Sequence, residues 1–160
     1  LMAISYAIAP ICLLTLREQV PEHKRPFTLA YAKPWAHAAF MICNLMTYFT
    51  GWYIISKLSI SLLLGLAVLF LYHRFSPRGK EIHFDWKAST WIWPYFIGIS
   101  LISYLGNFGQ GIQFLPFGWD CVVVCLFSYV IMKLAIHYRL DDNKTQAYIN
   151  DLQLEINPKD

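Results

Sequence analysis

The chain of 160 residues carries a net charge of +3 and is 57% hydrophobic and only 14% charged, whereas a soluble domain has about 25% charged residues. No Asp, Glu, Lys or Arg occurs in five long segments, 1–16, 34–56, 58–73, 88–119 and 121–132. Because about 20 apolar helical residues cross a hydrocarbon core roughly 30 Å thick, these segments predict an all-α integral membrane bundle with about five transmembrane helices. The basic residues lie in the breaks between apolar runs and form no continuous basic face, so we expect the lipid bilayer, and no nucleic acid, as the partner.

In chain order, we predict membrane spans at about 1–16, 35–56, 58–72, 89–107 and 119–138, followed by a polar tail at 139–160. Only Lys57 separates the second span from the third, so these two are predicted to form a hairpin with Lys57 at its tip. The first run stops at Arg17 after sixteen residues and is too short for a full crossing. We therefore expect the chain to begin partway through a helix, as a fragment of a longer protein.

The basic residues of the short loops predict the orientation of the chain, because cytoplasmic loops carry an excess of Lys and Arg. The first and third loops contain four basic residues each, the second contains Lys57 alone, and the fourth contains none. This alternation predicts a multi-pass protein of the cell (inner or plasma) membrane, with the first and third loops and the C-terminus in the cytoplasm. Apolar residues at helical spacing in the tail predict a short amphipathic helix that ends near Asn157 and Pro158.

Three polar side chains within the predicted spans are candidates for function, because polar and ionisable groups are costly in a membrane. Asn44 begins a polar stripe that either hydrogen-bonds a neighbouring helix or lines a pathway. Asp120, at the outer start of the fifth span, either stabilises the positive end of the helix dipole or is a proton-coupling carboxylate. Lys133, near the inner end of the same span, is expected to extend its amine to the lipid headgroups.

The sequence contains no nucleophile elbow, phosphate-binding glycine loop, paired membrane carboxylates or metal-ligand spacing. We therefore predict no catalytic residues, no cofactor and no metal site. The four cysteines lie within apolar runs and are predicted to be packing residues. At this point two classes of protein remain open: a five-span accessory or scaffolding subunit, and a membrane-embedded enzyme.

A distinctive pattern follows the first apolar run, and its residues are Leu16, Arg17, Pro21, Arg25, Pro26 and Phe27. This pattern resembles the cytoplasmic signature of the amino acid–polyamine–organocation permeases. Tyr6, Pro10 and Leu14 are similar to the tenth span of that family, although Ala30 stands where the family often has proline. The stretch 115–120 resembles the fourteen-span branch of the family that contains aspartate–proton symporter-like members.

The resemblance implies a leucine-transporter-like fold, of which this chain would hold the part from the tenth span onward together with peripheral spans. In that fold, broken helices form the substrate site near the middle of the membrane, and these are the first and sixth spans. The resemblance therefore implies a C-terminal fragment of a secondary active amino acid transporter. Amino acid transport, by proton-coupled symport or exchange, would belong to the full-length protein, and the substrate-binding residues would lie upstream of this chain.

Overall fold

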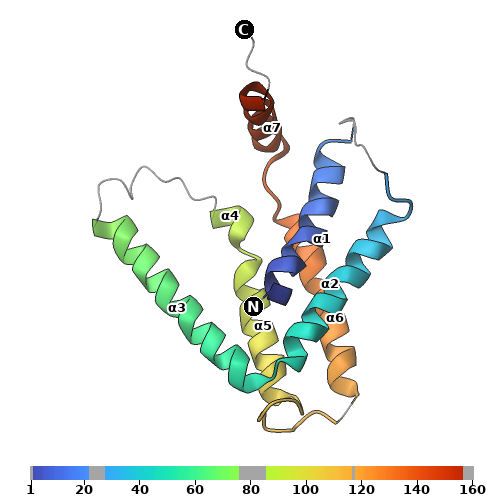
Figure 1. Ribbon diagram of the computed structural model, residues 1–160, viewed down its shortest axis with the longest axis vertical. Helices are drawn as coiled ribbons and strands as arrows, with labels where there is room; N and C mark the ends of the chain where they lie inside the picture. Colours follow the sequence, from blue (N-terminus) through green and yellow to red (C-terminus); the bar gives the residue numbers. More distant parts are fainter. Residues whose placement is uncertain (1, 22–27, 76–85, 117, 157–160) are drawn as a thin grey trace.

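The computed structural model describes residues 2–21, 28–75, 86–116 and 118–156, and within these ranges it contains helices and no strands. The helices are α1 (Met2–Gln19), α2 (Ala32–Phe49), α3 (Trp52–Phe75), α4 (Trp86–Ser89), α5 (Ile92–Leu105), α6 (Trp119–His137) and α7 (Asp142–Ile156). Helices α1, α2, α5 and α6 lie together, whereas α3 leans away from them and α7 extends beyond one end of the bundle (Figure 1). The predicted all-α class is therefore confirmed.

Helix α2 packs most extensively against α1 and α6 and also contacts α5. Its buried face repeats every four residues, and α6 buries a row with the same spacing that includes Val124 and Met132. Such rows are the ridges by which two helices interdigitate. The largest apolar cluster joins α1, α2, α5 and α6 and consists of Ala7, Ile11, Leu14, Ala36, Phe40, Tyr95, Ile131, Met132 and Ala135.

The turn between α2 and α3 lies at Thr50 and Gly51, and not at Lys57 as the sequence analysis expected. Gly51 has a φ of +85°, a left-handed conformation that glycine adopts without steric cost. Lys57 lies within α3, one turn after Tyr53, whose hydroxyl oxygen is 2.7 Å from the lysine Nζ. A single lysine with a partner for its amine does not interrupt a helix, and the chain therefore turns at the glycine.

The other helix bounds also differ from the predicted spans. Helix α1 continues to Gln19, and the segment predicted as the fourth span, 89–107, holds the shorter helix α5, with the single turn α4 just before it. Pro94 lies in the first turn of α5, where its missing N–H removes no helical hydrogen bond. With 14 residues, α5 is about 21 Å long.

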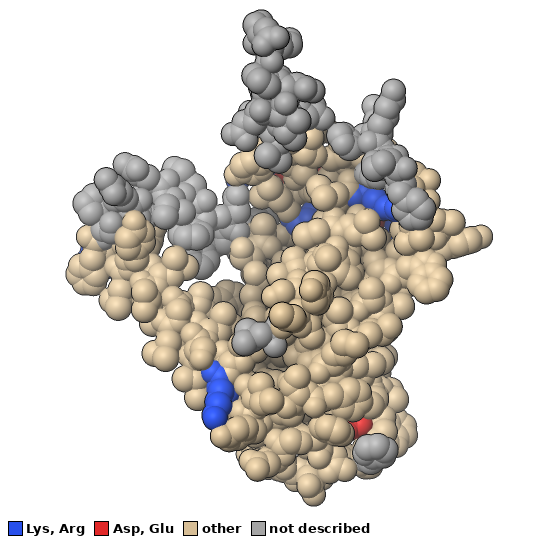
Figure 2. Space-filling model, viewed as in Figure 1, with Lys and Arg blue, Asp and Glu red and all other residues tan. Residues whose placement is uncertain are grey.

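Two of the described helices, α3 and α6, are long and apolar enough to cross a membrane, and α5 is a shorter apolar helix. Helix α3 buries only Ile55 and exposes large apolar side chains along its length. Few charged residues appear on the face drawn in Figure 2. Large apolar side chains exposed along a whole helix mark a surface that contacts lipid or other protein, in accordance with a helical membrane bundle.

Candidate functional site

Five buried polar side chains from three helices meet in the interior of the bundle. We call them the polar seam, and they are Asn44 and Tyr48 of α2, Tyr95 of α5, and Asp120 and Ser128 of α6. None of the five is more than 4% exposed. A buried polar group without a partner costs free energy, so the partners of each side chain decide what the seam can do.

Asn44 is the residue of the seam that joins three helices. Its Oδ1 accepts a hydrogen bond of 2.9 Å from the Tyr95 hydroxyl of α5, and its Nδ2 donates one of 2.9 Å to Ser128 Oγ of α6. The Ser128 hydroxyl in turn donates to the carbonyl oxygen of Val124, at 2.7 Å. The polar stripe of α2 therefore faces neighbouring helices, and Asn44 makes the interhelical hydrogen bonds that one of the two interpretations anticipated.

Asp120 lies in the first turn of α6 and is only 2% exposed. One carboxylate oxygen accepts a hydrogen bond of 2.6 Å from the Tyr48 hydroxyl. The other accepts from the backbone N–H groups of Gly118, at 3.0 Å, and Cys121, at 2.8 Å. The carboxylate thus satisfies amides at the start of α6, where the helix dipole also favours a negative charge, and it attaches this end of α6 to α2.

Lys133 lies outside the polar seam. Its side chain is exposed on α6, and its Nζ is 5.7 Å from the centre of the Tyr129 ring on the same helix. A lysine in this position can extend along the apolar surface toward the headgroups. The structure therefore brings Asn44 and Asp120 into one buried seam and leaves Lys133 exposed on the surface of α6.

Only part of the signature segment belongs to the described residues. Arg17 Nη1 donates a hydrogen bond of 3.2 Å to the carbonyl oxygen of Leu29, across the loop after α1, and Leu16 is 45% exposed. Pro21 lies two residues after the end of α1. Arg25, Pro26 and Phe27 lie outside the described residues.

A second polar cluster, which the sequence analysis did not identify, connects α1 to the chain after α6. Glu18 of α1 forms ion pairs with Arg139, at 2.6 Å, and with Lys33, at 3.4 Å. Gln19 donates a hydrogen bond from its side chain to the carbonyl oxygen of Leu140 and accepts one of 3.3 Å from the Thr145 hydroxyl of α7. Charged residues at helix ends are so common that the pattern alone does not single out these pairs.

Within the described part of the chain, no group of three metal-ligating side chains is close enough to hold an ion. The polar seam contains one carboxylate, one amide and three hydroxyl groups. Each of these side chains is hydrogen-bonded within the seam or to the backbone of α6. This arrangement stabilises contacts between helices and presents no open set of ligands.

Two curated relatives match the chain over most of its length. It is 30% identical over 135 residues to the glutamate/serine transporter AimA of Bacillus subtilis (strain 168), a match that covers 83% of this chain and 25% of that protein. It is 28% identical over 138 residues to the aspartate-proton symporter of the same organism, with 86% of this chain and 26% of that protein covered. This chain is homologous to amino acid permeases of the amino acid–polyamine–organocation type.

The permease homology confirms the resemblance that the signature indicated. No family model and no solved structure matches the chain. The chain spans about a quarter of the length of the permeases it matches.

Proposed function

We propose that this chain is the C-terminal part of a secondary active amino acid transporter and forms membrane spans that do not hold the substrate. Its homology to the glutamate/serine transporter and to the aspartate-proton symporter, over 83% and 86% of the chain, carries the proposal. Proton-coupled symport or exchange by the whole transporter is part of the same proposal, because one of the two relatives is named for coupling to protons.

The chemistry of the polar seam supports a substrate site outside these residues. A free amino acid presents an ammonium group and a carboxylate, and both need partners once water is removed. The seam carboxylate, Asp120, already accepts three hydrogen bonds, and the Asn44 amide bonds side chains of two other helices. An amino acid would have to displace these interactions in order to bind there.

The orientation is proposed from the charges. Lys33, Glu18 and Arg139 form ion pairs at the end of the bundle from which α7 extends, and α1 and α3 also end toward this side, each just before a segment predicted to be a cytoplasmic loop (Figure 1). Since Lys and Arg concentrate on the cytoplasmic side, we propose that this end and the C-terminus face the cytoplasm. The membrane is proposed to be the cell (inner or plasma) membrane.

A pair of chimeras tests the proposal. In the glutamate/serine transporter and in the aspartate-proton symporter, the residues that match this chain are replaced by this chain. We expect each chimera to retain the substrates of its parent, because the substrate site lies elsewhere. The measurement is uptake of labelled glutamate, serine and aspartate by vesicles, normalised to the amount of chimera in the membrane.

A common new preference in both chimeras would contradict the proposal, because the exchanged residues would then determine the substrate. The complementary experiment uses the 160-residue chain alone, in vesicles with a proton gradient and a mixture of labelled amino acids. We expect no uptake above that of empty vesicles, and the intact aspartate-proton symporter is the positive control. Saturable, gradient-driven uptake by the chain alone would show that it contains the site.

A further inference from the structure

A groove of about 630 Å³ lies between α3 and α5 and opens to the surface of the bundle. At one end, the rings of Trp52 and Tyr104 meet edge to face with their centres 5.1 Å apart. Nearby, the backbone N–H of Tyr53 bonds the carbonyl oxygen of Gly109, at 3.2 Å, so the start of α3 is attached to the loop after α5. From there the two helices diverge toward the C-terminal end of α3 (Figure 1).

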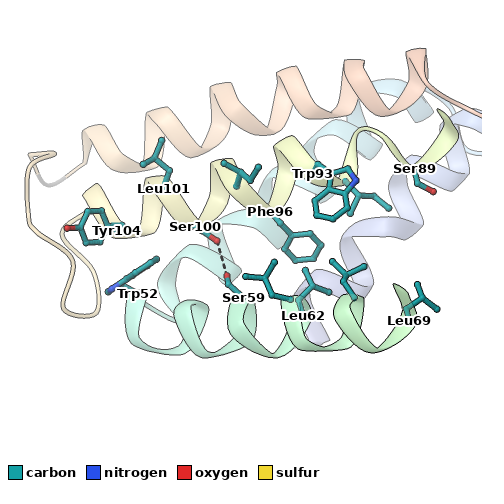
Figure 3. A pocket seen from close by; sticks show the side chains of 14 residues that line it. Trp52, Ser59, Leu62, Leu69, Ser89, Trp93, Phe96, Ser100, Leu101 and Tyr104 are labelled. Carbon is teal, nitrogen blue, oxygen red and sulfur yellow. Dashed lines mark hydrogen bonds between the residues drawn. The ribbon is translucent and has the colours of Figure 1, made fainter. Parts of the chain in front are cut away.

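The walls of the groove are almost entirely apolar. Figure 3 shows side chains of α3 and α5 facing one another across it, among them Leu62 and Phe96. Two of its hydroxyl groups are already paired, because Ser59 Oγ and Ser100 Oγ are 3.0 Å apart and Ser59 also donates to the carbonyl oxygen of Ile55, at 2.9 Å. Such walls offer few partners to a polar or charged molecule, and they therefore favour hydrocarbon as the occupant.

The length of the groove fits one leaflet of a bilayer. Between the serine pair at Ser59 and the last lining leucine of α3, Leu69, ten helical residues extend about 15 Å. The hydrocarbon core of a bilayer is roughly 30 Å thick, so one leaflet supplies acyl chains about half that long.

The two ends of the groove differ in charge. At the wide end, α3 carries His73 and Arg74 in its last turn, and His73 is four residues after Leu69 on the groove side of the helix. At the narrow end, the only basic residue of α3 is Lys57, whose amine is bound to the Tyr53 hydroxyl. An anionic headgroup is therefore attracted to the wide end, because basic residues near the membrane surface attract anionic lipids.

We propose that the groove between α3 and α5 binds one acyl chain of an anionic phospholipid, with the headgroup beside Arg74. The acyl chain lies along Leu62, Leu66 and Leu69 and ends at the Ser59–Ser100 pair. With the orientation given under the proposed function, this lipid belongs to the cytoplasmic leaflet, whereas the binding itself does not depend on transport.

Photolabelling tests this site in the whole 160-residue chain. The chain is placed in phosphatidylcholine vesicles that contain a little phosphatidylglycerol with a photoreactive group on its acyl chain, and mass spectrometry locates the label. We expect label on the groove residues of α3 and α5. Leu66→Trp should lower it several-fold, because the larger ring fills the groove, and Leu64→Trp is the matched control, since Leu64 is 63% exposed and outside the groove.

Three further outcomes decide the question. Arg74→Gln should lower the ratio of label from phosphatidylglycerol to label from phosphatidylcholine about fivefold. An unchanged ratio would overturn the headgroup assignment. Equal loss of label in the two tryptophan variants, or none in either, would show general contact with bulk lipid and no site. If a photoreactive residue at position 66 crosslinks to a second copy of the chain in place of lipid, the groove is a protein interface and the proposal is wrong.

Unlabelled phosphatidylglycerol provides a test that needs no substitution. In the unchanged chain it should compete more strongly with the label in the groove than with label on the Leu64 side of α3, because only a site saturates. Parallel competition on both sides of the helix would overturn the proposal, even if Leu66→Trp prevents the chain from inserting.

Discussion

The side chain of Asn44 concentrates the interhelical hydrogen bonding of the seam in one residue. Its amide reaches Tyr95 on one neighbouring helix and Ser128 on another, so that one substitution would remove contacts to both. In membrane proteins such bonds contribute about 0.6 kcal/mol on average and up to about 1.7 kcal/mol each. The residue is therefore expected to matter for stability.

Asn44→Leu tests this expectation. It should lower the free energy of unfolding by about 1–3 kcal/mol, because two interhelical bonds are lost and the Tyr95 hydroxyl remains buried without its acceptor. The measurement is unfolding of the purified chain by sodium dodecyl sulfate in mixed micelles. Ser56→Ala is the control, since the half-buried Ser56 hydroxyl donates to the carbonyl oxygen of Tyr53 within its own helix. A double-mutant cycle with Ser128→Ala should give a coupling energy, and purely additive effects would contradict the contact.

The sequence predicted one half of the seam and not the other. Asn44 and Asp120 were recognisable because polar residues are rare within apolar runs. Their partners were not, because Tyr95 and Ser128 belong to residue types that occur throughout the spans and also serve at membrane interfaces and in helix packing. The partnership of Tyr48 with Asp120 depends on the packing of α2 against α6, which no local pattern specifies.

At the scale of the elements, the turn between α2 and α3 packs closely against the loop between α5 and α6, backbone against backbone. A Cβ atom on Gly51, in the turn between α2 and α3, would lie 2.8 Å from the Cα of Gly109, in the loop between α5 and α6. Both glycines have positive φ angles, +85° and +70°. The two turns fit together only because neither residue has a side chain.

Gly51→Ala should lower the free energy of unfolding by about 1–3 kcal/mol, because the methyl group meets backbone that cannot rotate away and the residue keeps an unfavourable φ. Gly65→Ala is the matched control within the adjoining helix, where an added Cβ has no atom within 4 Å. That variant should be neutral or more stable by up to about 1 kcal/mol, since alanine favours a helix over glycine. The same detergent unfolding compares the two variants, and equal destabilisation would contradict the fit of the turns.

The existence of the helices followed from the apolar runs, whereas their bounds depended on glycines and prolines that the hydropathy pattern does not weigh. The break assigned to Lys57 shows the difference, because a charged residue marks a loop only when it has no partner near the helix. Around Gly51, the requirement for a left-handed residue was the better indicator of the turn.

At the scale of the whole molecule, the neighbours of each helix could not be predicted from the sequence. Periodicity identifies the buried face of a helix in a soluble protein, but in a membrane the lipid-facing side is apolar too. The mean hydropathy of α3 is similar to that of α6. Nevertheless, α6 is packed within the bundle, whereas α3 contacts the bundle mainly through α5. The attachment of the tail through Gln19 and Leu140 was likewise not recognisable from local sequence.

Cysteine labelling checks the proposed orientation of the whole chain. In a cysteine-free version, a cysteine at Gln113, which is exposed in the loop before α6, should react with an impermeant thiol reagent added outside intact cells. A cysteine at Gln146, exposed on α7, should react only after the cells are opened, because the tail is expected in the cytoplasm. The reverse pattern would contradict the orientation.

The hydrogen bonds of Asn44 also have an order in time. Tyr95 follows Asn44 by 51 residues and Ser128 follows it by 84. At a synthesis rate of about 5–20 residues per second, the serine is made roughly 4–17 s after the asparagine. During biogenesis the Asn44 amide is therefore without both partners at first, and then has Tyr95 alone. For these seconds α2 is stabilised by the insertion machinery or by α5, until α6 is inserted.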